Sequence, residues 1–477
     1  MDPHALTRRV LEPRAAFSRI ALALLLFAGG AGGAGCAGSG SGVDGTPGAA
    51  GLRDPYFPKL GNGGYDVRHY DLTLDYEPRT GRLEGTAALT ARATQDLSAF
   101  HLDLRGLTVE STTVDGAAAA VNRAGTELTV RPRRDIAKGA DFRTVVRYSG
   151  VPQTITGADA SREGWLRRPD GALAIGEPLG STTWFPGNHH PADKAAYDIT
   201  VTVPTGYEAV SNGEPAGERD RGGGRTAFAW RAAEPMASYL ATLAVGDFRV
   251  KATRTPDGLP VVTAVDPAVA RRSSALLDDI PRIVKWGTEN FGPYPFSSAG
   301  AIVVPSGDLG YALETQTRPV FPLDGFDETT LVHEVAHQWF GNSVSPATWQ
   351  DVWLNESFAT YAEWMWQQES DGVPVQENFE KAFADEANWA FAPAEPPDSS
   401  DLFGAPVYGR GAMVLHQVRQ AVGDEVFFGI ARGWAEKYRH SSASTDDFID
   451  FVEKESGKDL TKLWDVWLYG DKKPRRP

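Results

Sequence analysis

The chain has 477 residues, of which 42 % are hydrophobic and 23 % are charged. This is the composition of a globular protein, and the length is enough for two or three domains that each bury a core. Lys and Arg number 47 against 62 Asp and Glu, which gives a net charge of −15. A surface this acidic repels phosphate backbones, so nucleic acid is not an expected partner. The single cysteine, Cys36, excludes an intramolecular disulfide and a cysteine-rich zinc site.

The first 35 residues have the order of a secretory signal peptide. Four arginines within residues 1–19 precede the uncharged apolar run 20–28, and small residues follow it. This run is too short to span a bilayer, and an uncleaved anchor helix is the alternative. We therefore expect the chain to be exported from the cell.

Cys36 stands where the signal peptide would be cut. The segment Gly33-Ala34-Gly35-Cys36 resembles the lipobox of bacterial lipoproteins, in which the cysteine is lipidated after cleavage. The resemblance implies anchoring to the cell membrane, with the protein facing outside. Secretion, with Cys36 as a thiol of no special role, is the alternative. Residues 36–53 are rich in Gly, Ser and Ala and predict a flexible tether after the lipidated cysteine.

Residues 54–250 alternate apolar and polar side chains with a period of two. The runs 70–76, 142–148 and 197–203 are the clearest, and turn signals such as Asp115-Gly116 separate such runs. This pattern is typical of an antiparallel β-sheet with one buried face.

Residues 251–470 have a different spacing of apolar residues. Apolar residues recur at helical spacing over 268–291, 413–421 and 427–438, and Ser444 is a candidate N-cap for a further helix. The basic segment 471–477 is expected to be a solvated tail. The sequence thus predicts an α+β protein, with a β domain followed by a mostly helical domain.

The segment His333-Glu334-Val335-Ala336-His337 lies in an apolar run that is stopped by Gly341. On a helix, residues four apart share a face, so both imidazoles can bind one ion. Glu334 is rotated by about 100° from His333 and can reach a water beside that ion. A buried helix whose histidines are satisfied by hydrogen bonds is the alternative.

A third ligand strengthens the metal interpretation. Glu356 follows His337 by eighteen residues and begins a stretch rich in helix formers. Two imidazoles and one carboxylate suit a single Zn²⁺ ion with an open fourth position. Glu363 is two turns further on the same face, where it either hydrogen-bonds a ligand histidine or is an ordinary solvated acid.

Four segments together resemble the zinc aminopeptidases of the aminopeptidase N type, which include leukotriene hydrolases and belong to the gluzincin metallopeptidases. They are the His333–His337 motif with Glu356, the segment 310–315 (GYALET), the segment 408–412 (YGRGA), and Glu177 with the segment 184–191 (WFPGNHHP). The second is similar to that family's G-A-M-E-N segment and the third to its Tyr-x-Lys-Gly-Ala pattern. The resemblance implies a saddle- or sandwich-like β domain followed by a thermolysin-like catalytic domain.

The resemblance also implies roles for individual residues. Glu334 takes the proton of the attacking water, and Tyr408 donates its hydroxyl to the developing oxyanion. Glu177 and Glu314 bind the free α-ammonium of the substrate, which makes the enzyme an exopeptidase. Backbone groups of Tyr311 and Ala312 align the peptide. The expected substrates are peptides with a free N-terminus, and a monomer is expected.

Departures from the family pattern matter for the site. Tyr311 adds bulk where the family has glycine. The chain also stops soon after Tyr408, whereas larger relatives continue into a helical C-terminal domain, so we expect a more open site. Two other functions stay possible: a zinc endopeptidase with the same core, and a surface-anchored binding protein that is not an enzyme.

Overall fold

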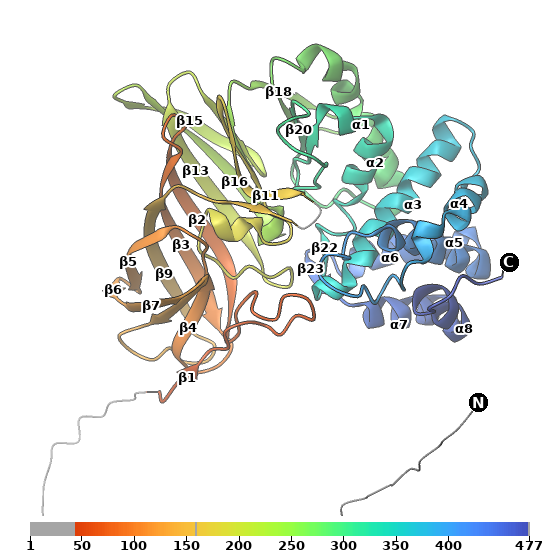
Figure 1. Cartoon of the computed structure of the whole chain (residues 1–477), viewed down its shortest axis with the longest axis horizontal. Helices are drawn as coiled ribbons and strands as arrows, with labels where there is room; N and C mark the ends of the chain where they lie inside the picture. Colours follow the sequence, from red (N-terminus) through yellow and green to blue (C-terminus); the bar gives the residue numbers. More distant parts are fainter. Residues whose placement is uncertain (1–42, 158–159, 476–477) are drawn as a thin grey trace, which may run out of the picture. The chain divides into compact units, whose positions relative to one another are not determined.

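The computed structural model describes residues 43–157 and 160–475 (Figure 1). The predicted signal peptide and Cys36 lie outside these residues, so export and lipid anchoring stay predictions. Among the described residues, no helix combines the length and the apolar character needed to cross a membrane.

An eight-stranded sheet is the centre of the N-terminal half, and its strands follow the predicted alternation. In β13, for example, every second side chain is buried. The sheet has the order β15-β16-β13-β2-β3-β9-β5-β6. The strands are β2 (Tyr65–Glu77), β3 (Arg82–Ala93), β5 (Thr108–Val114), β6 (Ala117–Ala118), β9 (Asp141–Gly150), β13 (Lys194–Pro204), β15 (Glu214–Gly222) and β16 (Arg225–Ala237).

The prediction of a purely antiparallel sheet is wrong at one pairing. Strand β13 runs parallel to β2, with Ile199 opposite Leu72, while the other pairings in this sheet are antiparallel. The alternation of side chains is the same in both kinds of pairing when one face is buried, so the sequence pattern could not distinguish them.

Two smaller sheets complete the β domain. The first has the order β1-β4-β8-β7 and contains β1 (Thr46–Pro47), β4 (Leu97–Asp103), β7 (Ala120–Ala124) and β8 (Glu127–Arg131). The second has the order β10-β11-β12-β17-β14 and contains β10 (Thr154–Thr156), β11 (Arg162–Arg168), β12 (Gly171–Ile175), β14 (Glu208–Ser211) and β17 (Leu243–Gly246). Short 3₁₀ turns lie at Gly180–Thr183 (η1) and Ser238–Leu240 (η2).

Part of the predicted tether is bound to this domain. β1 pairs with β4, and the backbone N–H of Gly48 donates to the carbonyl of Ala99 at 2.9 Å. The N–H of Gly45 donates to Asp135 at 2.7 Å. The flexibility predicted for residues 36–53 therefore does not hold from Gly45 onward. The flexibility was predicted from the small side chains of this segment, whereas the donors of these hydrogen bonds are backbone N–H groups, which every residue except proline has.

The second half begins with a four-stranded sheet of order β18-β19-β20-β21, and the predicted boundary at residue 250 falls inside its first strand. These strands are β18 (Arg249–Arg254), β19 (Pro260–Val265), β20 (Ala299–Val304) and β21 (Val320–Pro322). A two-stranded pair joins β22 (Val344–Pro346) to β23 (Ser441–Ala443).

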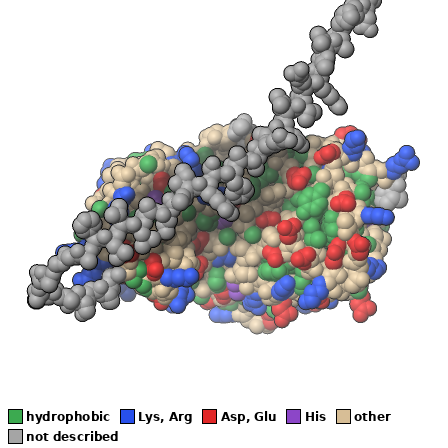
Figure 2. Space-filling view, turned by 90° about the horizontal axis from the view of Figure 1, so that it is seen from below, with side chains coloured by type: hydrophobic (Ala, Val, Ile, Leu, Met, Phe, Trp, Pro, Cys, Tyr) green, Lys and Arg blue, Asp and Glu red, His purple; other side chains and the backbone are tan. Residues whose placement is uncertain are grey.

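Helices make up most of the remainder, and they lie together at the side of the β18–β21 sheet (Figure 1). They are α1 (Ala270–Phe291), α2 (Glu328–Ala336), α3 (Trp353–Ser370), α4 (Val375–Ala384), α5 (Gly411–Val422), α6 (Asp424–Lys437), α7 (Thr445–Ser456) and α8 (Thr461–Leu463). Single turns of other helix types are η3 (Leu323–Gly325), η4 (Trp349–Val352), η5 (Glu386–Trp389), η6 (Pro406–Arg410) and η7 (Trp464–Leu468). Figure 2 shows acidic side chains interspersed with hydrophobic and basic ones over this helical part.

Local sequence explains where some of these helices begin and end. Ser444 caps α7 as predicted, because its hydroxyl accepts from the N–H of Asp447 and Asp447 accepts from the N–H of Ser444. The helix stops at Gly457, whose φ of +65° suits a residue without a side chain. Asp327 caps α2 by accepting from the N–H of Thr330 at 2.8 Å.

A buried carboxylate joins the two halves. Asp54, which is 2 % exposed, accepts from the N–H of Trp349 at 2.8 Å and from the N–H of Tyr56 at 2.9 Å. Burial raises the pKa of Asp54, but hydrogen bonds from His190 and from these backbone groups outweigh it and lower the pKa below its usual value. Trp349 begins η4, the turn that leads into α3.

We expect Asp54→Ala to lower the free energy of unfolding by on the order of 3 kcal/mol, because it leaves buried N–H groups without an acceptor. The folded pKa lies below the unfolded one, so this stabilisation is complete above the unfolded pKa of about 3.9. It is lost as the pH falls through the folded pKa. Urea unfolding of wild type and variant at several pH values measures the difference. The control is Asp247→Ala, an exposed carboxylate, and equal stability of Asp54→Ala and wild type at pH 7 would contradict the expectation.

Candidate metal centre and pocket

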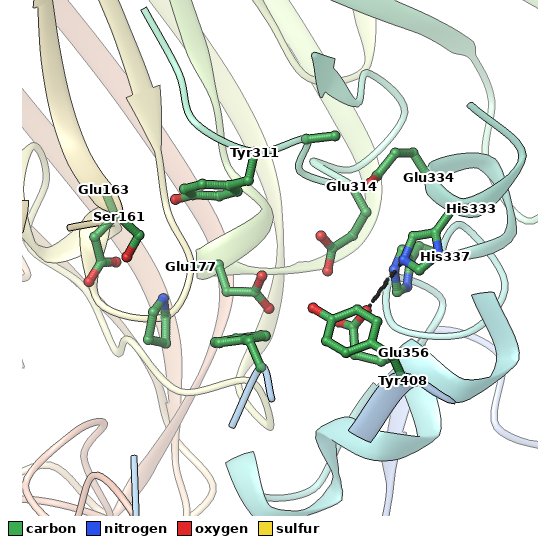
Figure 3. Close-up of a pocket in the computed structure, with 13 residues that line it drawn as sticks. Ser161, Glu163, Glu177, Tyr311, Glu314, His333, Glu334, His337, Glu356 and Tyr408 are labelled. Atoms are coloured by element: carbon green, nitrogen blue, oxygen red, sulfur yellow. Dashed lines mark ion pairs between the residues drawn. The ribbon is translucent and has the colours of Figure 1, made fainter. Parts of the chain in front are cut away.

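The two histidines of the motif lie at the end of α2. His333 is in its last turn and His337 immediately follows it, with the ring centroids 4.7 Å apart. Helix α3 packs beside α2 and presents Glu356 from its first turn. Figure 3 shows the three side chains pointing at one place.

Helix α2 ends at Ala336 and is therefore shorter than the apolar run 331–340. The chain then turns, and Gly341 adopts a φ of +123°, a region that favours glycine. A side chain at Gly341 would meet Asn355 and His337 at 3.3 Å. The turn places the carbonyl of Phe340 3.1 Å from Nδ1 of His337.

The hydrogen bonds of the imidazoles determine which nitrogens face the centre. Nδ1 of His333 is 2.6 Å from Glu363, and Nδ1 of His337 faces the carbonyl of Phe340. Because these partners only accept, each Nδ1 carries a proton, and each Nε2 has a lone pair for a cation when the imidazole is neutral. Both Nε2 atoms lie 3.4 Å from Oε2 of Glu356. Glu363 therefore contacts a candidate ligand histidine rather than being simply solvated.

The atoms that converge here require positive charge beside Glu356, which protons on the imidazoles or a metal cation can supply. The ligand atoms of His333, His337 and Glu356 lie within 4.8 Å of one another. Burial lowers the pKa of His337, but Glu356 and Glu314 outweigh it and raise the pKa to about 9. The same negative field attracts a divalent cation. Two imidazoles, one carboxylate and hydrogen bonds on both outer nitrogens fit Zn²⁺.

The pocket beside this centre is strongly acidic. It has a volume of about 300 Å³, and no Lys or Arg is among its lining residues. One carboxylate oxygen of each of Glu177, Glu314 and Glu334 is buried without a hydrogen-bond partner. Burial raises the pKa of Glu177 well above its usual value and that of Glu334 to about 8. Buried carboxylates without partners are stabilised by a positively charged ligand.

Glu314 is held by residues that follow the His333–His337 motif. Its backbone carbonyl accepts from Gln338 at 3.2 Å and from Asn342 at 2.6 Å. Glu177 comes from the β domain, directly after β12. Tyr311 and Ala312 line the pocket near Glu314, and the Tyr311 hydroxyl donates to the carbonyl of Arg162 at 3.1 Å. The pocket is therefore built by both halves of the fold.

Tyr408 reaches the pocket from the π-helical turn η6. Its ring is nearly parallel to that of His333, with centroids 6.1 Å apart, and its hydroxyl points toward Glu177 and Glu314 (Figure 3). Burial, with the nearby carboxylates, raises the pKa of Tyr408 well above its usual value, so the hydroxyl keeps its proton. Gly411 allows this placement, because a Cβ there would lie 2.7 Å from Cβ of Ser357 in α3.

Other lining residues were not singled out from the sequence. They are Ser161, Glu163, Pro178 and Phe403. Glu163 lies in the regular strand β11, and no local motif marks it as different from any other strand residue. Its presence in the pocket depends on how β11 packs against the catalytic half.

A β domain joined to a helical domain that holds a His-His-Glu centre is the arrangement of a two-domain zinc metallopeptidase. Comparison with known proteins supports this class. Residues 67–240 match the Peptidase M1 N-terminal domain, and residues 327–467 match the Peptidase family M1 domain. The crystal structure of the M1 zinc metallopeptidase from Deinococcus radiodurans is similar with a TM-score of 0.84 and 29% identity, over 89% of this chain and 98% of that chain.

Curated relatives carry aminopeptidase names. Aminopeptidase N of Streptomyces lividans is 28% identical over 60% of this chain and 36% of its own length. Probable aminopeptidase 1 of Sulfurisphaera tokodaii is 24% identical over 84% of this chain and 53% of its own length. The chain thus spans about a third to a half of the length of these curated relatives. It belongs to the M1 family of peptidases.

We expect Glu363→Ala to weaken zinc binding by about 10–100-fold, because Nδ1 of His333 loses the acceptor that orients the ring. Titration of zinc against a competing chelator measures the affinity. The matched control is Asp371→Asn, an exposed carboxylate at the end of the same helix. An unchanged zinc affinity in Glu363→Ala would remove this residue from the metal centre.

Proposed function

We propose that the chain is a zinc-dependent aminopeptidase that removes single residues from the N-terminus of peptides. The observation that carries the proposal is the pair of buried carboxylates, Glu177 and Glu314, with unpartnered oxygens beside the His-His-Glu centre. A free α-ammonium group supplies the positive charge and the hydrogen-bond donors that these carboxylates lack. The aminopeptidase names of the relatives support the same activity.

The residues of the chain have separate roles in this reaction. His333, His337 and Glu356 would hold one zinc ion, which would supply Lewis-acid chemistry for the scissile carbonyl and for the attacking water. Glu334 follows His333 directly and lines the pocket, and one of its carboxylate oxygens is buried without a hydrogen-bond partner. It accepts the proton of the attacking water and passes it to the leaving amine.

Tyr408 stabilises the charge that develops on the carbonyl oxygen. Its hydroxyl stays protonated and lies between the metal-binding side chains and Glu177, so it donates a hydrogen bond to an oxyanion formed there (Figure 3). Backbone groups of Tyr311 and Ala312 beside Glu314 align the peptide. Glu177 and Glu314 fix its first residue, and the cleaved bond is therefore the first one.

Two other functions use the same residues differently. A zinc endopeptidase needs no ammonium site, which leaves the buried pair Glu177 and Glu314 without a purpose. A binding protein needs neither a proton acceptor at Glu334 nor a protonated hydroxyl at Tyr408. The presence of both, aimed into one pocket with the metal-binding residues, favours an enzyme.

We expect purified chain to cleave a short peptide with a free N-terminus and to leave the same peptide intact when it is N-acetylated. Acetylation removes the charge that Glu177 and Glu314 bind. Mass spectrometry of the products over time gives both the rate and the position of the cut. Internal cleavage of both peptides would replace the proposal with the endopeptidase alternative.

We expect Glu334→Gln to lower kcat by about 10²–10⁴-fold through the loss of the proton acceptor. Tyr408→Phe should lower kcat by about 10²–10³-fold through the loss of one oxyanion donor. Zinc content and the unfolding transition should stay at the wild-type values in both variants. Steady-state kinetics on one free peptide measure the effects, and wild-type turnover in either variant would remove that residue from the mechanism.

A further inference from the structure

Glu163 is a fifth glutamate in the pocket, and the proposed mechanism does not use it. The other four have roles in metal binding, proton transfer or ammonium binding. Glu163 belongs to β11, is 9 % exposed, and lines the same cavity as the metal-binding residues. Its Oε2 accepts from the backbone N–H of Leu179 at 2.8 Å. The backbone N–H of Gly180 and the charge of Arg105 also stabilise this carboxylate. Neutral backbone donors still leave part of its accepting capacity unused.

Glu163 lies where the side chain of the first substrate residue would be bound. In Figure 3, Glu177 and Glu314 lie between Glu163 at one end and the histidines at the other. In a bound substrate, the ammonium lies at Glu177 and Glu314 and the scissile carbonyl lies near the histidines. The first side chain must then occupy the part of the pocket on the Glu163 side. Besides Glu163, that space is lined by Ser161, Pro178, Tyr311 and Phe403.

The walls of this space suit a long aliphatic stem. Tyr311 is held across it by the hydrogen bond of its hydroxyl to the carbonyl of Arg162, the residue before Glu163. Phe403 is 36% exposed, unusually open for a phenylalanine. Aromatic walls contact methylene groups favourably and attract a cation placed against their faces.

Charge also favours a cationic side chain here. Five glutamates line the cavity and no Lys or Arg does. A cavity lined by carboxylates and by no cationic side chain favours the entry of further positive charge. Burial raises the pKa of Glu163 to about 8, and a bound cation would restore its ionised form.

We propose that Glu163, with Tyr311 and Phe403, forms a binding site for the side chain of an N-terminal Lys or Arg, so that the enzyme prefers peptides with a basic first residue. The proposal rests on the aminopeptidase activity proposed above. It adds the chemical class of the first residue and assigns its recognition to a residue outside the metal centre.

The test compares two substrates that differ only in the terminal charge, lysyl and norleucyl p-nitroanilide. Wild type should cleave the lysyl substrate with a kcat/KM at least about tenfold higher. Glu163→Gln should bring the ratio close to one, mainly through KM for the lysyl substrate. The norleucyl rate should stay within about threefold of wild type. Gln keeps an acceptor for the N–H of Leu179 and removes only the charge, so a purely structural role would survive in this variant.

The control is Glu395→Gln, which removes an exposed carboxylate outside the pocket and should keep the wild-type ratio. A wild-type preference for norleucyl, or a lysyl preference that persists in Glu163→Gln, would overturn the proposal. So would an equal loss on both substrates, which would mean that the charge of Glu163 acts on the whole pocket and not on the first side chain. If zinc-loaded wild type cleaves neither substrate, the aminopeptidase activity itself fails, and this proposal with it.

Discussion

Three acceptor atoms that point at one place are the constraint on which the rest of this structure depends. Nε2 of His333, Nε2 of His337 and Oε2 of Glu356 lie close together in the interior, where a buried carboxylate needs positive charge beside it. Holding them there requires α2 to end at Ala336 and α3 to pack against it. It also requires Glu363 and the carbonyl of Phe340 to accept from the outer nitrogens.

The pocket next to this centre depends on contacts between the two halves of the fold. The ammonium of Lys194, at the start of β13, donates to the carbonyls of Asn342 and Ser343 at 2.8 and 2.7 Å. Asn342 in turn donates to the carbonyl of Glu314. Together with Asp54, these hydrogen bonds couple the β domain to the turn after the metal-binding helix. Glu177 of the β domain can therefore face Glu314 across a narrow space.

The β domain thus contributes to chemistry as well as to stability. A metal centre of this kind, with a neighbouring proton acceptor, could attack any peptide bond that reached it. The acidic residues brought from the β domain restrict what can enter, because a buried carboxylate that stays ionised needs a positive partner. In our proposals, specificity for a chain end and for a basic side chain therefore depends in part on Glu177 and Glu163 of the β domain.

Much of the fold could be predicted from side-chain periodicity, but not every pairing or boundary. The strands around 70–76, 142–148 and 197–203 are confirmed, and so is the cap at Ser444. The parallel pairing of β13 with β2 was missed because alternation does not encode strand direction. The attachment of β1 was missed because its hydrogen bonds come from the backbone.

The sequence by itself determined that His333 and His337 share one face with Glu334 beside them, because a four-residue spacing on a helix places side chains on one face without help from elsewhere. Glu356 was a candidate third ligand, and the packing of α3 against α2 brings it to the two histidines. The sequence also indicated Tyr408, Glu177 and Glu314 through their resemblance to a family, and the structure brings these residues to one pocket. Only the tertiary structure decided that Glu163 joins them and that Glu363 contacts His333. Both depend on contacts between elements distant in the chain. The sequence left two alternatives open for Glu363, and no local pattern marked Glu163 at all.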